Sequence, residues 1–97
     1  MSIVVVAQAA FSESGARAFI DWSKSPDGYV LTRAYDGFEH IETWLGEDQK
    51  TVYLYEKWAS KEHHQAYLKF RVETGLMEFL GPHLEGEFTV SYFHNAD

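Results

Sequence analysis

The sequence predicts an α+β domain in which two helices cover one face of an antiparallel sheet. Three observations support this fold. Residues 51–58 alternate between two side-chain rows, as a strand does. Residues 60–74 continue as a capped helix, and strand-like segments occur near both ends of the chain, at 3–10 and 87–93. With the turn residues between them, the predicted order is β-α-β-β-α-β, the ferredoxin-like arrangement.

The predicted strand Thr51–Trp58 has two different faces. It is rich in aromatic and β-branched residues, and successive side chains of a strand point to opposite sides of a sheet. One row comprises Val52, Leu54, Glu56 and Trp58, and the other comprises Tyr53, Tyr55 and Lys57. We expect the row that contains Trp58 to border the helices.

The first half of the chain supplies the other predicted elements. Ser12 or Ser14 caps a first helix, whose apolar positions recur at helical spacing. Ser25–Gly28 form a turn after it. The residues that follow predict a second strand at Tyr29–Tyr35, and the polar stretch Asp36–Lys50 is expected to be the hairpin connection.

The second helix is expected to form one wall of a cleft. Ser60 stands at its N-cap, Gly75 marks a bend, and Gly81–Pro82 ends it. Its side chains recur at three and four residues, so one stripe should face the sheet. That stripe is predicted to comprise Ala59, His63, Ala66, Tyr67, Phe70, Met77 and Leu80. The cleft would lie between this stripe and Trp58.

Length and composition limit the possible domain organisation and the possible partners. The 97 residues are expected to form a single domain, 1–97. A net charge of −7 argues against nucleic acid or an anionic membrane as a partner. The chain has no cysteine, no run of apolar residues long enough to span a membrane, and no basic segment before its first apolar run. A soluble, cytoplasmic protein is expected.

The junction of strand and helix resembles a known family. Tyr55-Glu56-Lys57-Trp58, followed by Ser60 and a helix, is similar to the pattern that ends the third strand of the antibiotic biosynthesis monooxygenases. The resemblance extends over most of the chain. It implies dimers whose two sheets close into an α/β barrel, planar aromatic substrates between helix and sheet, and oxidation by O₂ without a cofactor.

A homodimer is predicted on physical grounds as well. Tyr53, Tyr55 and every second residue of the other strands would leave a broad apolar and aromatic face in water if the protein were a monomer. A twofold pair would bury that face. The resemblance implies in addition that the last strand often crosses to the partner.

The residues around the cleft each have a structural and a functional interpretation. Trp58 is a core aromatic or a wall for the substrate, and His63 is a hydrogen-bonded histidine or the catalytic base. Tyr67 and Arg71 are either structural groups or donors to a developing oxyanion. The predicted catalytic residues are His63 and Trp58, and the predicted substrate-binding residues are Tyr67, Arg71, Leu54 and Phe70. His64, one step round the helix, is expected to face solvent.

No metal or cofactor is predicted. The histidines are His40, His63, His64, His83 and His94, and no two of them have the helical spacing of a metal-binding pair. The sequence also has no glycine-rich phosphate loop or dinucleotide fingerprint. Any oxidation would therefore proceed without a bound flavin or nicotinamide, and the family resemblance implies that an electron-rich quinol, phenol or polyketide-like substrate supplies the electrons.

Two departures from the family pattern narrow the chemistry. Leu54 replaces the asparagine that the anthrone-oxidising branch carries, and Met77 and Tyr67 occupy the positions of the histidine and tryptophan of the haem-degrading branch. Anthrone oxidation and haem degradation are therefore disfavoured. Three hypotheses remain open: a cofactor-independent monooxygenase, a non-catalytic binding module for a small ligand, and a polyketide-type cyclase or isomerase.

Overall fold

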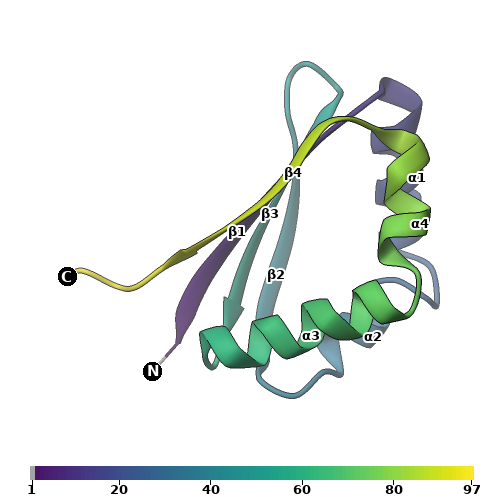
Figure 1. The fold of residues 1–97 in the computed structure, drawn as a ribbon. Helices are drawn as coiled ribbons and strands as arrows, with labels where there is room; N and C mark the ends of the chain where they lie inside the picture. Colours follow the sequence, from purple (N-terminus) through teal and green to yellow (C-terminus); the bar gives the residue numbers. More distant parts are fainter. Residues whose placement is uncertain (1) are drawn as a thin grey trace.

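The computed structural model describes residues 2–97, which form a four-stranded antiparallel sheet with a layer of helices on one face (Figure 1). The strand order is β2-β3-β1-β4. In chain order the elements are β1 (Ile3–Phe11), α1 (Glu13–Ser23), α2 (Tyr29–Arg33), β2 (Phe38–Leu45), β3 (Thr51–Trp58), α3 (Lys61–Glu73), α4 (Leu76–Leu80), a 3₁₀ turn (Gly81–His83) and β4 (Leu84–Phe93). The predicted α+β, ferredoxin-like fold is confirmed.

Several local predictions are confirmed. Strand β3 has the predicted bounds, and its Trp58 row faces the helices, since Val52, Glu56 and Trp58 are buried. Ser12 is the N-cap of α1, where its hydroxyl accepts a hydrogen bond from the Gly15 N–H. Ser60 caps α3 in the same way. Gly75, with φ of 107°, separates α3 from α4 in a conformation that favours glycine.

The predicted second strand is wrong. Tyr29–Tyr35 contains the short helix α2, and the strand β2 lies inside the segment predicted to be a loop. A bulge explains why the alternation of inward and outward side chains that marks a strand is not evident in the sequence of β2. Phe38 pairs with Trp58 and His40 with Lys57, so Glu39 is an extra residue that shifts the inward positions from Phe38 to Ile41.

The predicted stripe of the second helix is also wrong. The buried side chains of α3 are His64, Tyr67 and Arg71, whereas Ala66 and Met77 are exposed. The helix is therefore rotated by about one residue relative to the prediction: Tyr67 and Leu80 are buried as predicted, and Phe70 packs against the core while partly exposed. Two polar residues, His64 and Arg71, occupy the sheet-facing row, and a search for apolar periodicity does not detect them.

The helix-free face of the sheet carries exposed aromatic side chains among polar ones. Trp44 on β2 is directly opposite Tyr53 on β3, and they are 61% and 39% exposed. The Trp44 indole N–H donates to Glu42, which also contacts His40. The face is thus aromatic beside the β2–β3 turn, at one edge of the sheet, and it is more polar than the sequence predicts. In residues 2–97 no helix is long and apolar enough to cross a membrane.

Candidate ligand pocket

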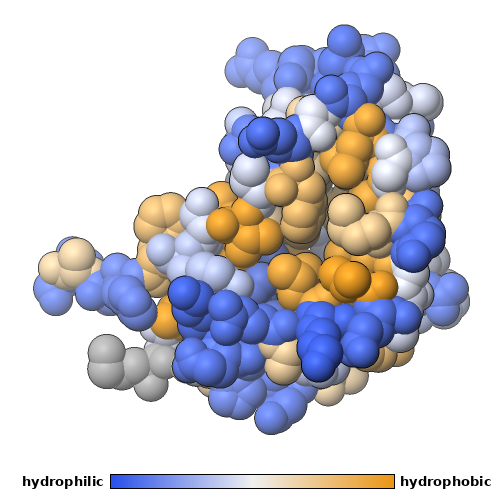
Figure 2. Space-filling model, viewed as in Figure 1, coloured by the Kyte–Doolittle hydropathy of each residue, from blue (hydrophilic) through white to orange (hydrophobic). Residues whose placement is uncertain are grey.

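A largely apolar pocket lies between the sheet and the helices, at the place predicted for the cleft. Side chains from every strand and from all four α-helices line it. Its cavity volume is about 40 Å³, and partly exposed apolar residues such as Leu68, Leu76 and Phe88 form its outer wall. In the space-filling view, hydrophobic side chains surround a hollow between β4 and the helices α3 and α4 (Figure 2).

A buried guanidinium group forms one end of the pocket. Arg71 is 5% exposed, and its Nε–H donates to the Tyr67 hydroxyl at 2.8 Å. Its terminal nitrogens donate to the Asp27 carbonyl oxygen at 2.9 Å, the Gly28 carbonyl oxygen at 2.7 Å and the Thr32 hydroxyl at 2.9 Å. The guanidinium also lies over the Trp22 ring, with its central carbon 5.0 Å from the ring centroid.

All of these acceptors are neutral. In residues 2–97 no carboxylate oxygen lies within 4.0 Å of the Arg71 nitrogens. A buried cation ordinarily has an anionic partner, because removing its charge from water is costly. The positive charge of Arg71 therefore makes this end of the pocket suited to an anionic or oxygen-rich group of a ligand.

The short helix α2 completes this donor cluster. Its Thr32 side chain is fully buried, and the Thr32 hydroxyl lies 2.7 Å from the Tyr67 hydroxyl. Both hydroxyls accept a hydrogen bond from Arg71, so one of them donates to the other. Burial raises the pKa of Tyr67, against the lowering effect of Thr32 and Arg71. Tyr67 thus remains a protonated donor at neutral pH.

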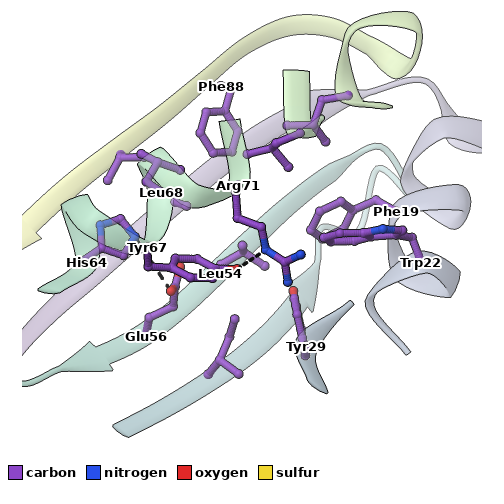
Figure 3. A pocket seen from close by; sticks show the side chains of 15 residues that line it. Phe19, Trp22, Tyr29, Leu54, Glu56, His64, Tyr67, Leu68, Arg71 and Phe88 are labelled. Atoms are coloured by element: carbon purple, nitrogen blue, oxygen red, sulfur yellow. Dashed lines mark hydrogen bonds and ion pairs between the residues drawn. The ribbon is translucent and has the colours of Figure 1, made fainter. Parts of the chain in front are cut away.

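The other end of the pocket holds a carboxyl group. Glu56 projects from β3, is 3% exposed, and accepts a hydrogen bond at 2.9 Å from the Trp58 indole N–H. Burial raises the pKa of Glu56 to about 7, although the Trp58 hydrogen bond lowers it. The close-up shows Glu56, His64 and Tyr67 gathered at this end, with Arg71 reaching toward Trp22 (Figure 3).

His64 lies beside Glu56. Its Nε2 is 3.9 Å from Glu56 Oε1, and its Nδ1 is 2.9 Å from the Tyr92 hydroxyl. Burial lowers the pKa of His64 to about 4, so the imidazole is neutral at physiological pH. The expectation that His64 faces solvent is wrong, because the Ser60 cap fixes a helix phase that turns this residue inward.

The predicted site residues divide into two groups. Leu54, Tyr67 and Arg71 line the pocket together. His63 does not line it: the imidazole bonds the Ser60 hydroxyl at 2.7 Å, and its Nε2 lies 3.5 Å from Asp36. The predicted place of His63 on the sheet-facing stripe is therefore wrong.

Trp58 and Phe70 lie outside the lining as well. Trp58 is fully buried and packs on Tyr67, with 5.0 Å between ring centroids, which fits its interpretation as a core aromatic. Phe70 borders an outer groove together with Trp22 and Arg71. Arg71 thus separates the inner pocket from this groove.

Sequence reasoning missed Glu56 and Tyr29, which line the pocket, and Thr32, which bonds the lining residues Tyr67 and Arg71. A signal for Glu56 was present, since an acid in the same strand row as Val52 and Trp58 must be buried with them. No comparable signal marked Thr32 and Tyr29, because their segment was assigned to a strand. In residues 2–97 no group of three or more potential metal ligands occurs.

The fold is similar to that of several proteins of known structure. No family model matches the sequence, and no curated protein matches it. Solved structures do match. A monooxygenase from the ActVA-Orf6 gene of Streptomyces coelicolor, in complex with nanaomycin D, has a TM-score of 0.81 and 16% identity, over 99% of this chain and 88% of that one.

Two further structures show the same similarity. An antibiotic biosynthesis monooxygenase has a TM-score of 0.81 and 12% identity, over 98% of this chain and 99% of that one. A conserved protein from Methanosarcina mazei has a TM-score of 0.80 and 15% identity, over 97% of this chain and 92% of that one. The chain therefore has the fold of the antibiotic biosynthesis monooxygenases.

Proposed function

We propose that the protein is a cofactor-independent monooxygenase that oxidises an electron-rich quinol, phenol or polyketide-like aromatic with O₂. The observation that carries this proposal is the buried pair of Arg71 and Tyr67, which line an apolar pocket and are held in place by the Thr32 hydroxyl. Removing a proton from such a substrate leaves a negative charge, and donors fixed in a dry site stabilise that charge far better than water does.

The substrate supplies all four electrons that reduce O₂ in this reaction. Loss of a proton gives a phenolate or carbanion, which passes an electron to O₂, and the resulting radical pair recombines. For a quinol, one oxygen atom enters the ring and the other leaves as water, so that quinol and O₂ give a hydroxyquinone and water. The task of the protein is to exclude water, orient the ring and hold the charge.

The similar fold of a monooxygenase that was solved with nanaomycin D supports an aromatic ligand. The cavity of about 40 Å³ is much smaller than the roughly 300–1,000 Å³ of ligand-filled pockets. A ring therefore enters only when the outer wall moves. The partly exposed side chains Leu68, Leu76 and Phe88 form that wall, and a rearrangement there leaves the strands unchanged.

We propose a homodimer that is built on the helix-free face. Trp44 and Tyr53 form an exposed aromatic pair on it, beside the β2–β3 turn, and a second copy would cover them by stacking sheet on sheet. Two sheets paired in this way would close into the α/β barrel that the family resemblance implies. The acidic chain disfavours nucleic acid and membranes as partners.

Oxygen uptake tests the proposed reaction. The purified protein is given quinols, naphthols and anthrones, without added metal, flavin or nicotinamide, and dissolved O₂ is followed with an electrode. We expect uptake above autoxidation with at least one quinol or naphthol. The proposal fails if the folded protein leaves the whole panel unoxidised.

A non-catalytic binding module is the second candidate. Leu54 in the pocket wall favours it, because the amide that the anthrone-oxidising branch carries at this place is missing. Such a module would be stabilised by a panel compound without consuming O₂. Product that forms equally well under anaerobic conditions would instead identify a cyclase or isomerase.

A further inference from the structure

Glu56 is a buried acid without a cationic partner. Its Oε1 accepts the Trp58 hydrogen bond and is 3.9 Å from the neutral His64 ring. Among residues 2–97, no Lys or Arg nitrogen lies within 4.0 Å of the carboxylate. A buried carboxylate that merely stabilises the fold would be expected to have a cation or several hydrogen bonds.

One carboxylate oxygen remains open to the cavity. No hydrogen bond to Glu56 Oε2 is present among residues 2–97. Every fully buried side-chain nitrogen or oxygen of these residues has a partner, so Oε2 is not enclosed in the core. Because Glu56 lines the pocket, this unpartnered oxygen borders the space that a ligand would fill.

Glu56 faces apolar and titratable side chains from every element around it. Val5 on β1 and Ile41 on β2 are its apolar cross-strand neighbours. The titratable groups are His64 and Tyr67 on α3, Tyr29 on α2 and Tyr92 on β4. Burial raises the pKa of all three tyrosines, so they keep their protons at neutral pH and do not compete as bases.

The histidines are poor alternatives as a base. His63 lies outside the pocket, against Ser60 and Asp36. His64 borders the pocket, but its Nδ1 bonds Tyr92, and its pKa of about 4 makes it a weak proton acceptor. A general base is most effective when its pKa is close to the working pH, and Glu56 meets that condition.

We propose that Glu56 is the catalytic base, whose open Oε2 takes the proton from the bound aromatic substrate. This inference rests on the proposed function. The O–H or C–H bond of the substrate breaks, the proton moves to Oε2, and the electron pair stays on the substrate as a phenolate or carbanion. Trp58 and His64 contact the other carboxyl oxygen, Oε1, and so position the carboxyl group. The proton is returned when reduced oxygen leaves as water.

The main test compares Glu56→Gln with the wild-type protein and with Glu73→Gln, a matched change of an exposed glutamate at the end of α3. Glutamine keeps the shape and the acceptor for Trp58 but takes no proton. We expect kcat to fall by about 10²- to 10⁴-fold, the usual contribution of a general base. Glu73→Gln should match the wild type, and Glu56→Asp should retain part of the activity.

A second readout does not depend on turnover. Infrared difference spectra are recorded as 4-nitrophenol binds at pH 7, where the absorbance of the phenolate reports the ionisation of the probe. We expect a carboxylic-acid band to appear with bound phenolate, and to be lost in Glu56→Gln but not in Glu73→Gln. Thermal melting of each variant confirms that it is folded.

The outcomes separate the two claims. The wild-type protein could bind nitrophenol with protonation of Glu56 and yet consume no O₂ with any compound. That result would support Glu56 as a base and overturn the proposed monooxygenase activity. Undiminished turnover in folded Glu56→Gln would overturn the base and leave the monooxygenase intact. Bound phenolate without a Glu56-dependent carboxylic-acid band would likewise overturn the assignment of Glu56 as the base.

Discussion

The Arg71 guanidinium donates its Nε–H to the Tyr67 hydroxyl at 2.8 Å, one helical turn away on α3. The same guanidinium holds the carbonyl oxygens of Asp27 and Gly28, so Arg71 ties the helix to the turn before α2. Among residues 2–97, its positive charge meets only neutral acceptors and aromatic rings. One side chain therefore supports both the fold and the proposed anion site.

Replacing Arg71 with methionine should destabilise the protein by about 3 kcal/mol. The change removes the donor to two backbone carbonyls and two hydroxyls, and each buried group left unsatisfied costs roughly 1–3 kcal/mol. Urea unfolding at pH 7 measures the loss. Arg17→Met, an exposed arginine on α1, is the control and should stay within about 0.5 kcal/mol of wild type. Equal stability of the two variants would contradict the structural role of Arg71.

Replacing Tyr67 with phenylalanine should reduce kcat by about 10²-fold or more, the usual loss for one oxyanion donor. The ring and its packing on Trp58 remain, but the buried Arg71 Nε–H loses its acceptor, so the melting temperature should also fall and activity is compared at a temperature where the variant is folded. Tyr35→Phe is the matched change, because the Tyr35 hydroxyl bonds only the Ala66 carbonyl at 3.3 Å, near the surface. A comparable loss of activity in both variants would show that the Tyr67 hydroxyl has no special role.

His63→Ala should keep most of its activity. The imidazole packs over Gly37, where an added Cβ would lie 2.4 Å from the ring, and it bonds Ser60 outside the pocket. We expect a stability loss of about 1 kcal/mol from the disturbed start of α3. Steady-state kinetics beside urea unfolding separate the two effects. Loss of turnover in a fully stable variant would restore His63 as the base.

The dependence of stability on pH should show two opposing contributions. Burial raises the pKa of Glu56 from 4.5 to about 7, so the native state binds more protons there, and its contribution falls as pH rises through this interval. Burial lowers the pKa of His64 from 6.5 to about 4, so the unfolded state binds more protons, and this contribution rises with pH over that interval. The two nearly cancel in the wild type.

Glu56→Gln removes one of these contributions and should reveal the other. Its free energy of unfolding should rise by up to about 3 kcal/mol between pH 4 and 6.5, at about 1.4 kcal/mol per pKa unit. His64→Gln should show the opposite trend between pH 4.5 and 7. Urea unfolding at a series of pH values measures both. Parallel pH profiles for the two variants would contradict the assigned pKa directions.

Trp44→Glu should shift the protein from dimer to monomer. The exposed indole lies opposite Tyr53 on the helix-free face, and a carboxylate there would be buried without a partner in a sheet-to-sheet interface. Light scattering after gel filtration measures the mass. Val30→Glu, an exposed apolar residue of α2, is the control and should remain dimeric. A monomeric wild type would contradict the proposed dimer.

Much of the fold was predictable because its signals are local. The Trp58 row of β3 and the serine caps at Ser12 and Ser60 depend on neighbouring residues alone. Helix α2 is different, because long-range bonds from Arg71 to Gly28 and Thr32 hold it in place. Those bonds outweigh the strand propensity of its Val30 and Thr32, and no local pattern reports them.

The site was harder to predict than the fold. Leu54, Tyr67 and Arg71 were placed correctly, but the choice between His63 and His64 depends on the phase of one helix, which a single residue of rotation reverses. Glu56 was assigned to the inward row without a chemical role. The proposed role of Glu56 rests on the absence of a Lys or Arg partner for its carboxylate among residues 2–97. Only the three-dimensional structure reveals that absence.

Mass spectrometry of the product formed from a quinol under heavy-isotope O₂ tests the central claim most directly. The claim predicts that one labelled oxygen atom enters the ring, that the second appears in water, and that neither chelators nor removal of small molecules changes the yield. A product that carries only unlabelled oxygen from the solvent, or no conversion by the folded protein, would contradict it.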